Sequence, residues 1–276
     1  PNVGRRYFPE EKQPPAPPRD AFLATKPAHS MRIFVLGESS AAGFPYPHNG
    51  TFSRVLRDVL TDILPNDTVE VVNLGIEATN SYAVADFVGE IIDQHPDAVL
   101  IYAGHNEYYG ALGSASTGRI GTVPSLVRFY LKVERFRLVQ LFRSALSAAS
   151  GAKRGGVDGR TMQSAAMDQL ILLGTPQYKT GINQLENNLT SAIGRFRRAG
   201  IAVYVGSLVS NLRDQPPLAS LSTAGREGKG AAGSFAEAQH EAANGDPAIA
   251  RKLFVRARDL DELRFRAPTD FNAVIQ

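Results

Sequence analysis

Short apolar runs alternate with amphipathic segments along much of the chain. Three runs have the pattern of strands buried on both faces of a sheet: 32–36, 69–74 and 98–103. Between them, the segments 52–64 and 82–94 carry apolar residues at helical spacing. This order of strands and helices predicts a parallel sheet with right-handed crossovers, and therefore a three-layer α/β fold of the flavodoxin-like kind.

Two interruptions break the alternation. The first lies at about 111–177 and the second at about 208–265. Between them, 182–198 has the period of a helix and 201–206 has the composition of a fourth strand. The expected architecture is a central parallel sheet with helical insertions after its third and fourth strands.

Each insertion contains one segment with a distinct pattern. Segment 124–146 combines an apolar face with several Arg and Lys residues. It fits either a plain amphipathic helix packed on the core or an element that covers a pocket or touches a membrane surface. Segment 244–257 is similar to the turn and second helix of a single tetratricopeptide unit, which does not make a repeat array.

The N-terminal segment 1–30 is dense in proline, which removes backbone donors and favours extended structure. It is expected to be an arm or linker that leads into one domain over 31–276. The chain starts at Pro1 without an initiator Met and contains no apolar run of about 18 residues, so neither a signal peptide nor a membrane span is predicted within it. A membrane anchor upstream of Pro1 is an open alternative.

Composition excludes several classes of chemistry. With 276 residues, 43% of them hydrophobic, the chain can bury a large core. The balance of 30 Lys and Arg against 27 Asp and Glu, a net charge of +3, is too even to predict nucleic-acid binding. The absence of cysteine excludes disulfides, thiolate metal sites and a cysteine nucleophile.

Small and polar residues follow the first three predicted strands, at the sheet edge where parallel α/β folds bind ligands. Ser39 and Ser40 follow the first strand, Gly75 the second and Asn106 the third. A serine can attack a carbonyl carbon, a glycine allows close approach to the backbone, and an asparagine carboxamide can donate to an oxyanion. Each residue alone also fits an ordinary turn, and their joint placement is what favours a site.

This order resembles the SGNH family, also called GDSL hydrolases, whose blocks are Gly-Asp-Ser, Gly, Gly-x-Asn-Asp and Asp-x-x-His. Three of the four blocks are matched, over about 31–207. The resemblance implies Ser39 as nucleophile, with the backbone N–H groups of Ser39 and Gly75 and the side chain of Asn106 as oxyanion-hole donors. It also implies acyl-ester hydrolysis through an acyl-serine intermediate, without a metal ion or organic cofactor.

The chain departs from the family pattern beside the first and third blocks. Glu38 and Glu107 stand where the family has aspartates, which keeps the charge and adds a methylene group. Together with Ser40 and His105, these glutamates are expected in or beside the substrate pocket. Ser40 is not expected to be the nucleophile, because the family's nucleophile directly follows the acidic residue.

The fourth block is missing from the chain. The closest imitation of Asp-x-x-His is Glu237 with His240, which lies in the second insertion and not after a fifth strand. His48 is expected at the rim of the pocket, and His29 and His95 in solvated loops. The expectation is that a fifth strand and the catalytic histidine follow Gln276, so that this chain by itself is a severely impaired enzyme.

Two other functions remain open on the sequence alone. One is an acyltransferase that passes the acyl group to a polysaccharide, and the other is a non-catalytic interaction module that uses the tetratricopeptide-like segment. The expected ligand of the enzyme is a small-molecule, glycan or lipid ester, and no nucleic-acid partner is expected. The proline-rich arm and the lack of cysteine fit an extracytoplasmic bacterial protein slightly better than a cytoplasmic one.

Overall fold

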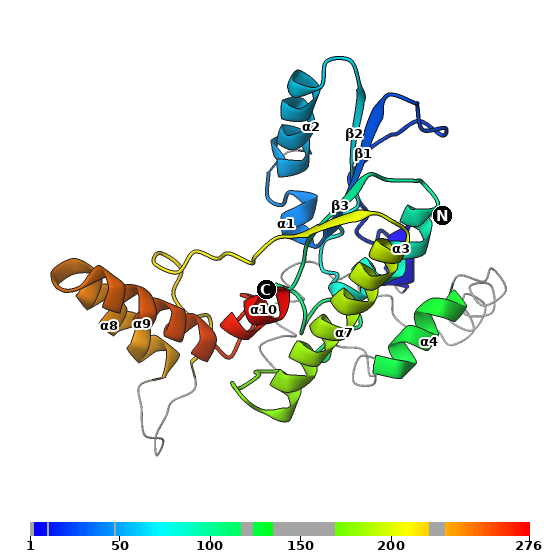
Figure 1. The fold of residues 1–276 in the computed structure, drawn as a ribbon. Helices are drawn as coiled ribbons and strands as arrows, with labels where there is room; N and C mark the ends of the chain where they lie inside the picture. Colours follow the sequence, from blue (N-terminus) through cyan, green and yellow to red (C-terminus); the bar gives the residue numbers. More distant parts are fainter. Residues whose placement is uncertain (1–2, 10, 47, 117–123, 135–168, 221–229) are drawn as a thin grey trace.

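A four-stranded parallel sheet lies at the centre of the computed structural model, which describes residues 3–9, 11–46, 48–116, 124–134, 169–220 and 230–276. The strand order is β2-β1-β3-β4 (Figure 1). In register, Val35 lies between Asn73 of β2 and Leu100 of β3. The predicted parallel α/β fold is therefore confirmed. The strands are β1 (Ser30–Gly37), β2 (Thr68–Asn73), β3 (Ala98–Tyr102) and β4 (Ala202–Val205).

Helices lie on both faces of the sheet (Figure 1). On one face, α3 (Ser81–Ile92) packs against α7 (Pro176–Arg198), and their apolar residues join the main core. On the other face lie the single-turn helix α1 (Ser39–Ala42) and α2 (Phe52–Ile63). A short 3-10 turn, η2 (His48–Gly50), precedes α2. The two faces together give the expected three layers.

The α2 face of the sheet is less completely covered than the sequence predicts. Leu56 and Leu60 of α2 pack on the sheet, whereas four apolar residues of the same helix stay exposed. In β4, which the sequence predicted as an apolar strand, Tyr204 is 63% exposed. The apolar composition of these elements therefore overstates their burial within the described residues. The exposed positions on α2 are Phe52, Val55, Val59 and Ile63.

The proline-rich segment packs along the domain rather than standing apart from it. It begins with a 3-10 turn, η1 (Val3–Arg6), and the Tyr7 hydroxyl then donates to Asp86 of α3 at 2.9 Å. Farther along, the ring of Phe22 contacts that of Phe34 in β1, with centroids 5.5 Å apart. This segment is thus an arm fixed by contacts to two elements of the core.

The two predicted insertions contain helices. In the first, α4 (Pro124–Glu134) buries Val127 and Leu131 in the main core, while the rest of the predicted helix, 135–146, lies outside the described residues. In the second, α8 (Ala231–Asn244) and α9 (Pro247–Leu260) form a hairpin with a small apolar cluster of its own. Figure 1 shows this hairpin extending away from the sheet.

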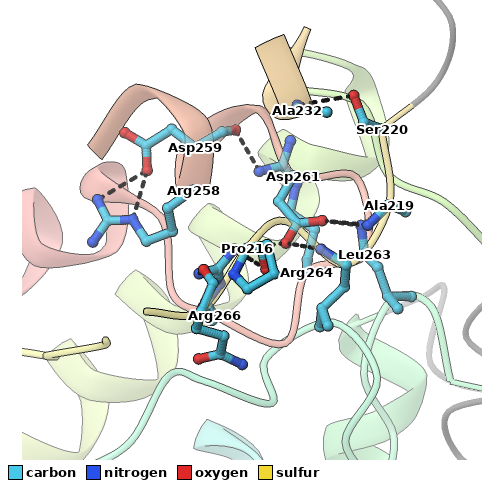
Figure 2. Close-up of polar contacts among 12 residues, drawn as sticks. Pro216, Ala219, Ser220, Ala232, Arg258, Asp259, Asp261, Leu263, Arg264 and Arg266 are labelled. Carbon is cyan, nitrogen blue, oxygen red and sulfur yellow. Dashed lines mark hydrogen bonds and ion pairs between the residues drawn. The ribbon is translucent and has the colours of Figure 1, made fainter. Parts of the chain in front are cut away.

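The segment after α9 packs on the main core and carries buried charged residues, whose polar contacts Figure 2 shows. Asp261 accepts hydrogen bonds from the backbone N–H groups of Leu218 and Ala219, at 2.9 and 3.0 Å, and forms a 2.9 Å ion pair with Arg266. Arg264, only 2% exposed, places its guanidinium over the ring of Tyr178. The final helix, α10 (Thr269–Ile275), then packs against α7.

Among the residues that the structure describes, no helix combines the length and the apolar character needed to cross a bilayer.

Candidate functional site

Ser39 lies at the first position of α1, directly after β1 and the extended residue Glu38. The turn closes when Ala42 N–H donates to the Glu38 carbonyl at 2.8 Å. Because the first amides of a helix have no acceptor within it, the Ser39 N–H points out of the turn without an intrahelical partner. Ser39 is half-buried and Ser40 is exposed. The strand–turn–helix geometry thus presents a serine at the carboxyl edge of the sheet.

Glu38 connects this turn to the loop after β3. Its Oε1 accepts the Gly104 N–H at 2.8 Å and its Oε2 accepts the Asn106 N–H at 2.9 Å. The carboxyl is 1% exposed, and burial, reinforced by the charge of Glu107, raises its pKa to about 8, although backbone hydrogen bonds oppose the rise. The predicted place of Glu38 in the pocket is corrected: its side chain supports the site from beneath, because it faces the backbone of the β3 loop.

Glu107 is also a buried supporting residue rather than part of a pocket wall. It is fully buried and accepts hydrogen bonds from the Ser81 N–H at 3.1 Å, the Ser81 hydroxyl at 2.6 Å and Gln184 Nε2 at 2.5 Å. Burial raises its pKa to about 7, with the three donors acting against that rise. Glu107 thereby joins the start of α3 to α7 behind the β3 loop.

Asn73, the last residue of β2, holds the turn of Ser39 and α1 from the other side. Its Nδ2 donates to the Ala41 carbonyl of α1 at 2.7 Å and to Ser53 Oγ at 3.0 Å. Its Oδ1 accepts the Gly75 N–H at 2.9 Å. The sequence did not single out Asn73 for this role; its only signal was a polar residue ending an apolar strand.

Gly75 allows α1 to pack closely on the loop after β2. A Cβ at this position would lie 2.5 Å from the Ala42 nitrogen and 2.9 Å from the Ala41 carbonyl carbon, so only glycine fits without displacing the backbone. The Gly75 N–H is already donated to Asn73. Its role as an oxyanion donor stays a prediction, because that hydrogen bond would first have to break.

Asn106 meets the requirements of an oxyanion donor more directly. Its backbone is fixed at both sides, since its N–H donates to Glu38 and its carbonyl accepts the Gly110 N–H at 2.7 Å. The residue is 7% exposed, and its carboxamide has no hydrogen-bond partner among the described residues. The backbone of Asn106 is thus held by hydrogen bonds, while its carboxamide is uncommitted among the described residues; its role as an oxyanion donor stays a prediction.

His105 borders the same loop but is not poised as a base. Its Nδ1 accepts the Ala267 N–H at 3.3 Å, so the proton of the neutral imidazole is on Nε2. Burial, together with the charge of Arg258, lowers the pKa of His105. A neutral ring with its lone pair committed to Ala267 cannot take the proton of Ser39 in this arrangement.

The remaining histidines do not complete the site. His240 lies on the α8–α9 hairpin with its side chain 73% exposed, where its nearest acidic neighbour is Glu241 at 4.0 Å. His95 follows α3 at the opposite end of β3, and His29 precedes β1. His48 lies in η2, and its side chain is outside the described residues. Within the described part of the chain, no group of three or more His, Asp or Glu side chains could hold a metal ion.

An apolar groove of about 410 Å³ begins at the α1 turn. Ser40 forms one end, and the incompletely covered face of β3 and β4 forms its floor. The groove can accept an apolar group next to Ser40, the residue that follows Ser39. Its main side-chain walls are Phe52, Leu100, Tyr102, Tyr204 and Val209.

Comparisons with known proteins give only remote similarity. No protein-family model and no curated protein sequence matches the chain. Among solved structures, the SGNH-hydrolase family esterase AlinE4 is 13% identical, with 83% of this chain and 99% of that chain covered and a TM-score of 0.32. A putative lipolytic protein of the G-D-S-L family from Desulfitobacterium hafniense DCB-2 is 14% identical, with 64% and 77% covered and a TM-score of 0.29.

A variant of Axe2, an acetyl xylan esterase from Geobacillus stearothermophilus, is 13% identical, with 88% of this chain and 98% of that chain covered and a TM-score of 0.28. Scores at this level carry no argument about reaction or substrate.

Proposed function

We propose that this chain carries the nucleophile and the oxyanion-stabilising groups of a serine ester hydrolase. The observation that carries the proposal is the joint attachment of the Ser39 turn to Asn73 on one side and, through Glu38, to the loop of Asn106 on the other. These ties hold a half-buried serine, its own first-turn amide and an uncommitted carboxamide at one edge of the sheet.

The proposed reaction has two steps. Ser39 Oγ attacks the ester carbonyl carbon while its proton passes to a base, and the resulting oxyanion accepts hydrogen bonds from the Ser39 N–H and the Asn106 carboxamide. The alkoxide then leaves with a proton and the acyl group stays on Ser39, from which water releases it as a carboxylic acid. Each such donor stabilises the transition state by about 2.7–4 kcal/mol in a site shielded from water.

The proposal requires a base that the described residues do not supply. His105 is committed to Ala267, and His240 lies on the exposed α8–α9 hairpin. An Asp-x-x-His block in a longer sequence stays a prediction. Without such a base, we expect the chain to react with activated acyl or phosphonyl groups slowly and to turn over esters very poorly.

The groove beside Ser40 favours esters with an apolar acyl group. Its walls are aromatic and aliphatic, and they begin next to the nucleophile turn. Fluorophosphonates with an octyl or an ethyl substituent test this directly, because they report nucleophile reactivity without turnover. We expect faster labelling by the octyl reagent and loss of that preference in Tyr204→Glu; equal rates for both reagents would refute the acyl groove.

The oxyanion assignment is tested by Asn106→Ala, with thermal unfolding measured alongside. We expect labelling of Ser39 to slow by about 100-fold, because the lost donor acts on the developing charge. Labelling at the wild-type rate would remove Asn106 from this role. Transfer to a polysaccharide would share the same first step, and it is distinguished by whether the acyl group is released to water or passed to an added glycan.

A further inference from the structure

A second pocket, of about 440 Å³, lies between α3, α4 and α7. It shares no lining residue with the groove beside Ser40. Its wall brings together Arg128 and Lys132 of α4 and Arg195 of α7. The basic character of segment 124–146 is thus directed, in part, into a cavity.

Three cations in one wall repel one another unless an anion lies between them. Arg128 and Lys132 are four residues apart on the same helix, a spacing at which like charges are destabilising. The acidic side chain in this wall, Asp86, is already engaged, because it accepts the Tyr7 hydroxyl at 2.9 Å and pairs with Arg6 at 3.2 Å. Among the described residues, the contact that Arg195 Nη1 makes is a long one, 3.4 Å, to the Ala85 carbonyl. The pocket therefore has a net positive charge.

Tyr82 also lines this pocket. Tyr82 is 1% exposed, and its hydroxyl has no hydrogen-bond partner among the described residues. Burial and the nearby Glu107 carboxylate raise the pKa of Tyr82 to about 12, against the opposing charge of Arg128, so the group keeps its proton. Buried polar groups are rarely left without a partner, and a protonated phenol next to three cations is a donor that suits an anionic acceptor.

We propose that this pocket binds a phosphate group, as inorganic phosphate or as a phosphate ester. Arg128, Lys132 and Arg195 would supply the positive charge, and the Tyr82 hydroxyl would donate a neutral hydrogen bond. Phosphate fits better than a carboxylate, because its higher charge and larger number of oxygens match several cations and a hydroxyl converging from three helices. The volume leaves room for an ester substituent in addition to the phosphate itself.

Calorimetric titration of the protein with inorganic phosphate, at constant ionic strength, tests the proposal. We expect saturable binding that weakens by about tenfold in Arg195→Gln, in Arg128→Gln and in Tyr82→Phe, since each removes one hydrogen bond to a charged acceptor. Tyr82→Phe is the sharpest variant, because it changes neither net charge nor any protein hydrogen bond that the structure shows. Arg197→Gln is the matched control, since Arg197 lies on the same helix α7 and is exposed outside the pocket.

Vesicles distinguish the source of the phosphate. A lipid headgroup is identified if the protein binds phosphatidic acid vesicles but not phosphatidylcholine vesicles, and if Tyr82→Phe weakens that binding as it weakens phosphate binding. A soluble ester is identified if a soluble sugar phosphate displaces phosphate and the protein does not bind vesicles. Absence of phosphate binding to the wild-type protein would overturn the proposal. An equal loss in Arg197→Gln and Arg195→Gln would overturn it as well, because it would show diffuse electrostatic attraction rather than a site.

Discussion

Glu38 Oε2 accepts the backbone N–H of Asn106 at 2.9 Å, so a carboxyl buried beneath the turn of Ser39 fixes the backbone of the candidate oxyanion donor. The same carboxyl also accepts the Gly104 N–H. One side chain therefore couples the tips of β1 and β3. This relationship links the chemistry proposed for Ser39 to the stability and pH response of the fold.

The free energy of unfolding should fall as pH rises between about 4.5 and about 8. The pKa of Glu38 is raised in the folded state from an ordinary 4.5 to about 8 by burial and by Glu107, so the folded state binds more protons than the unfolded state in this range. The stabilisation of the folded state by the protonated Glu38 carboxyl is fully present below about pH 4.5 and is lost as the pH rises through about 8. The slope from this group approaches about 1.4 kcal/mol per pH unit.

Urea unfolding at several pH values measures that slope. Glu38→Gln cannot ionise, so its unfolding free energy should depend less on pH over this range than that of the wild type. The comparison uses the slope and not the absolute stability, because the amide also changes the hydrogen bonds to Gly104 and Asn106. An unchanged slope in the variant would show that Glu38 does not titrate as described.

Gly75→Ala should destabilise the protein by about 1–3 kcal/mol, because the new Cβ would lie 2.5 Å from the Ala42 nitrogen and force α1 away from the β2 loop. The rate at which a fluorophosphonate labels Ser39 should also fall in this variant. Gly194→Ala is the matched control, because Gly194 lies inside α7 and an added Cβ would lie 3.5 Å from Arg198 Nη1, an ordinary contact distance. This variant should stabilise the protein by about 0.5–1 kcal/mol. Wild-type stability in Gly75→Ala would contradict the close packing.

Asp261→Ala should cost about 3–5 kcal/mol of unfolding free energy, because it leaves the charge of Arg266 buried without its carboxylate and removes the acceptor of the Leu218 and Ala219 amides. Chemical denaturation measures the loss. Asp62→Ala, at an exposed position of α2, should stay within about 0.5 kcal/mol of the wild type. Equal stability of the two variants would mean that the segment after α9 is not held by this ion pair.

The sequence predicted the sheet and the sheet edge at which the candidate residues lie, because apolar runs and helical periods are local signals. It did not predict which way the glutamates face. Glu38 is buried by Gly104 and Asn106, which are far from it along the chain, and only the folded loops determine that contact. For the same reason, the sequence predicted Glu38 and Glu107 only as residues in or beside the substrate pocket.

The sequence also did not predict that an arginine side chain is buried. Charged residues are rarely fully buried unless they are paired, and a short segment rich in arginine normally indicates a surface. Arg264 is nevertheless 2% exposed, because the Ile171 and Asp259 carbonyls accept its donors and the ring of Tyr178 covers its guanidinium. Partners supplied by three separate segments leave no periodic pattern in the sequence.

The most direct test of the central claim is the site of covalent modification by a fluorophosphonate, determined by mass spectrometry. The account predicts slow labelling of the wild-type protein with the adduct on Ser39, unchanged labelling in Ser40→Ala, and none in Ser39→Ala. Ser40 is the matched control, because it is the neighbouring serine and more exposed to solvent. An unlabelled wild-type protein, or a Ser39→Ala variant that is labelled at the wild-type rate, would contradict the assignment of Ser39 as nucleophile.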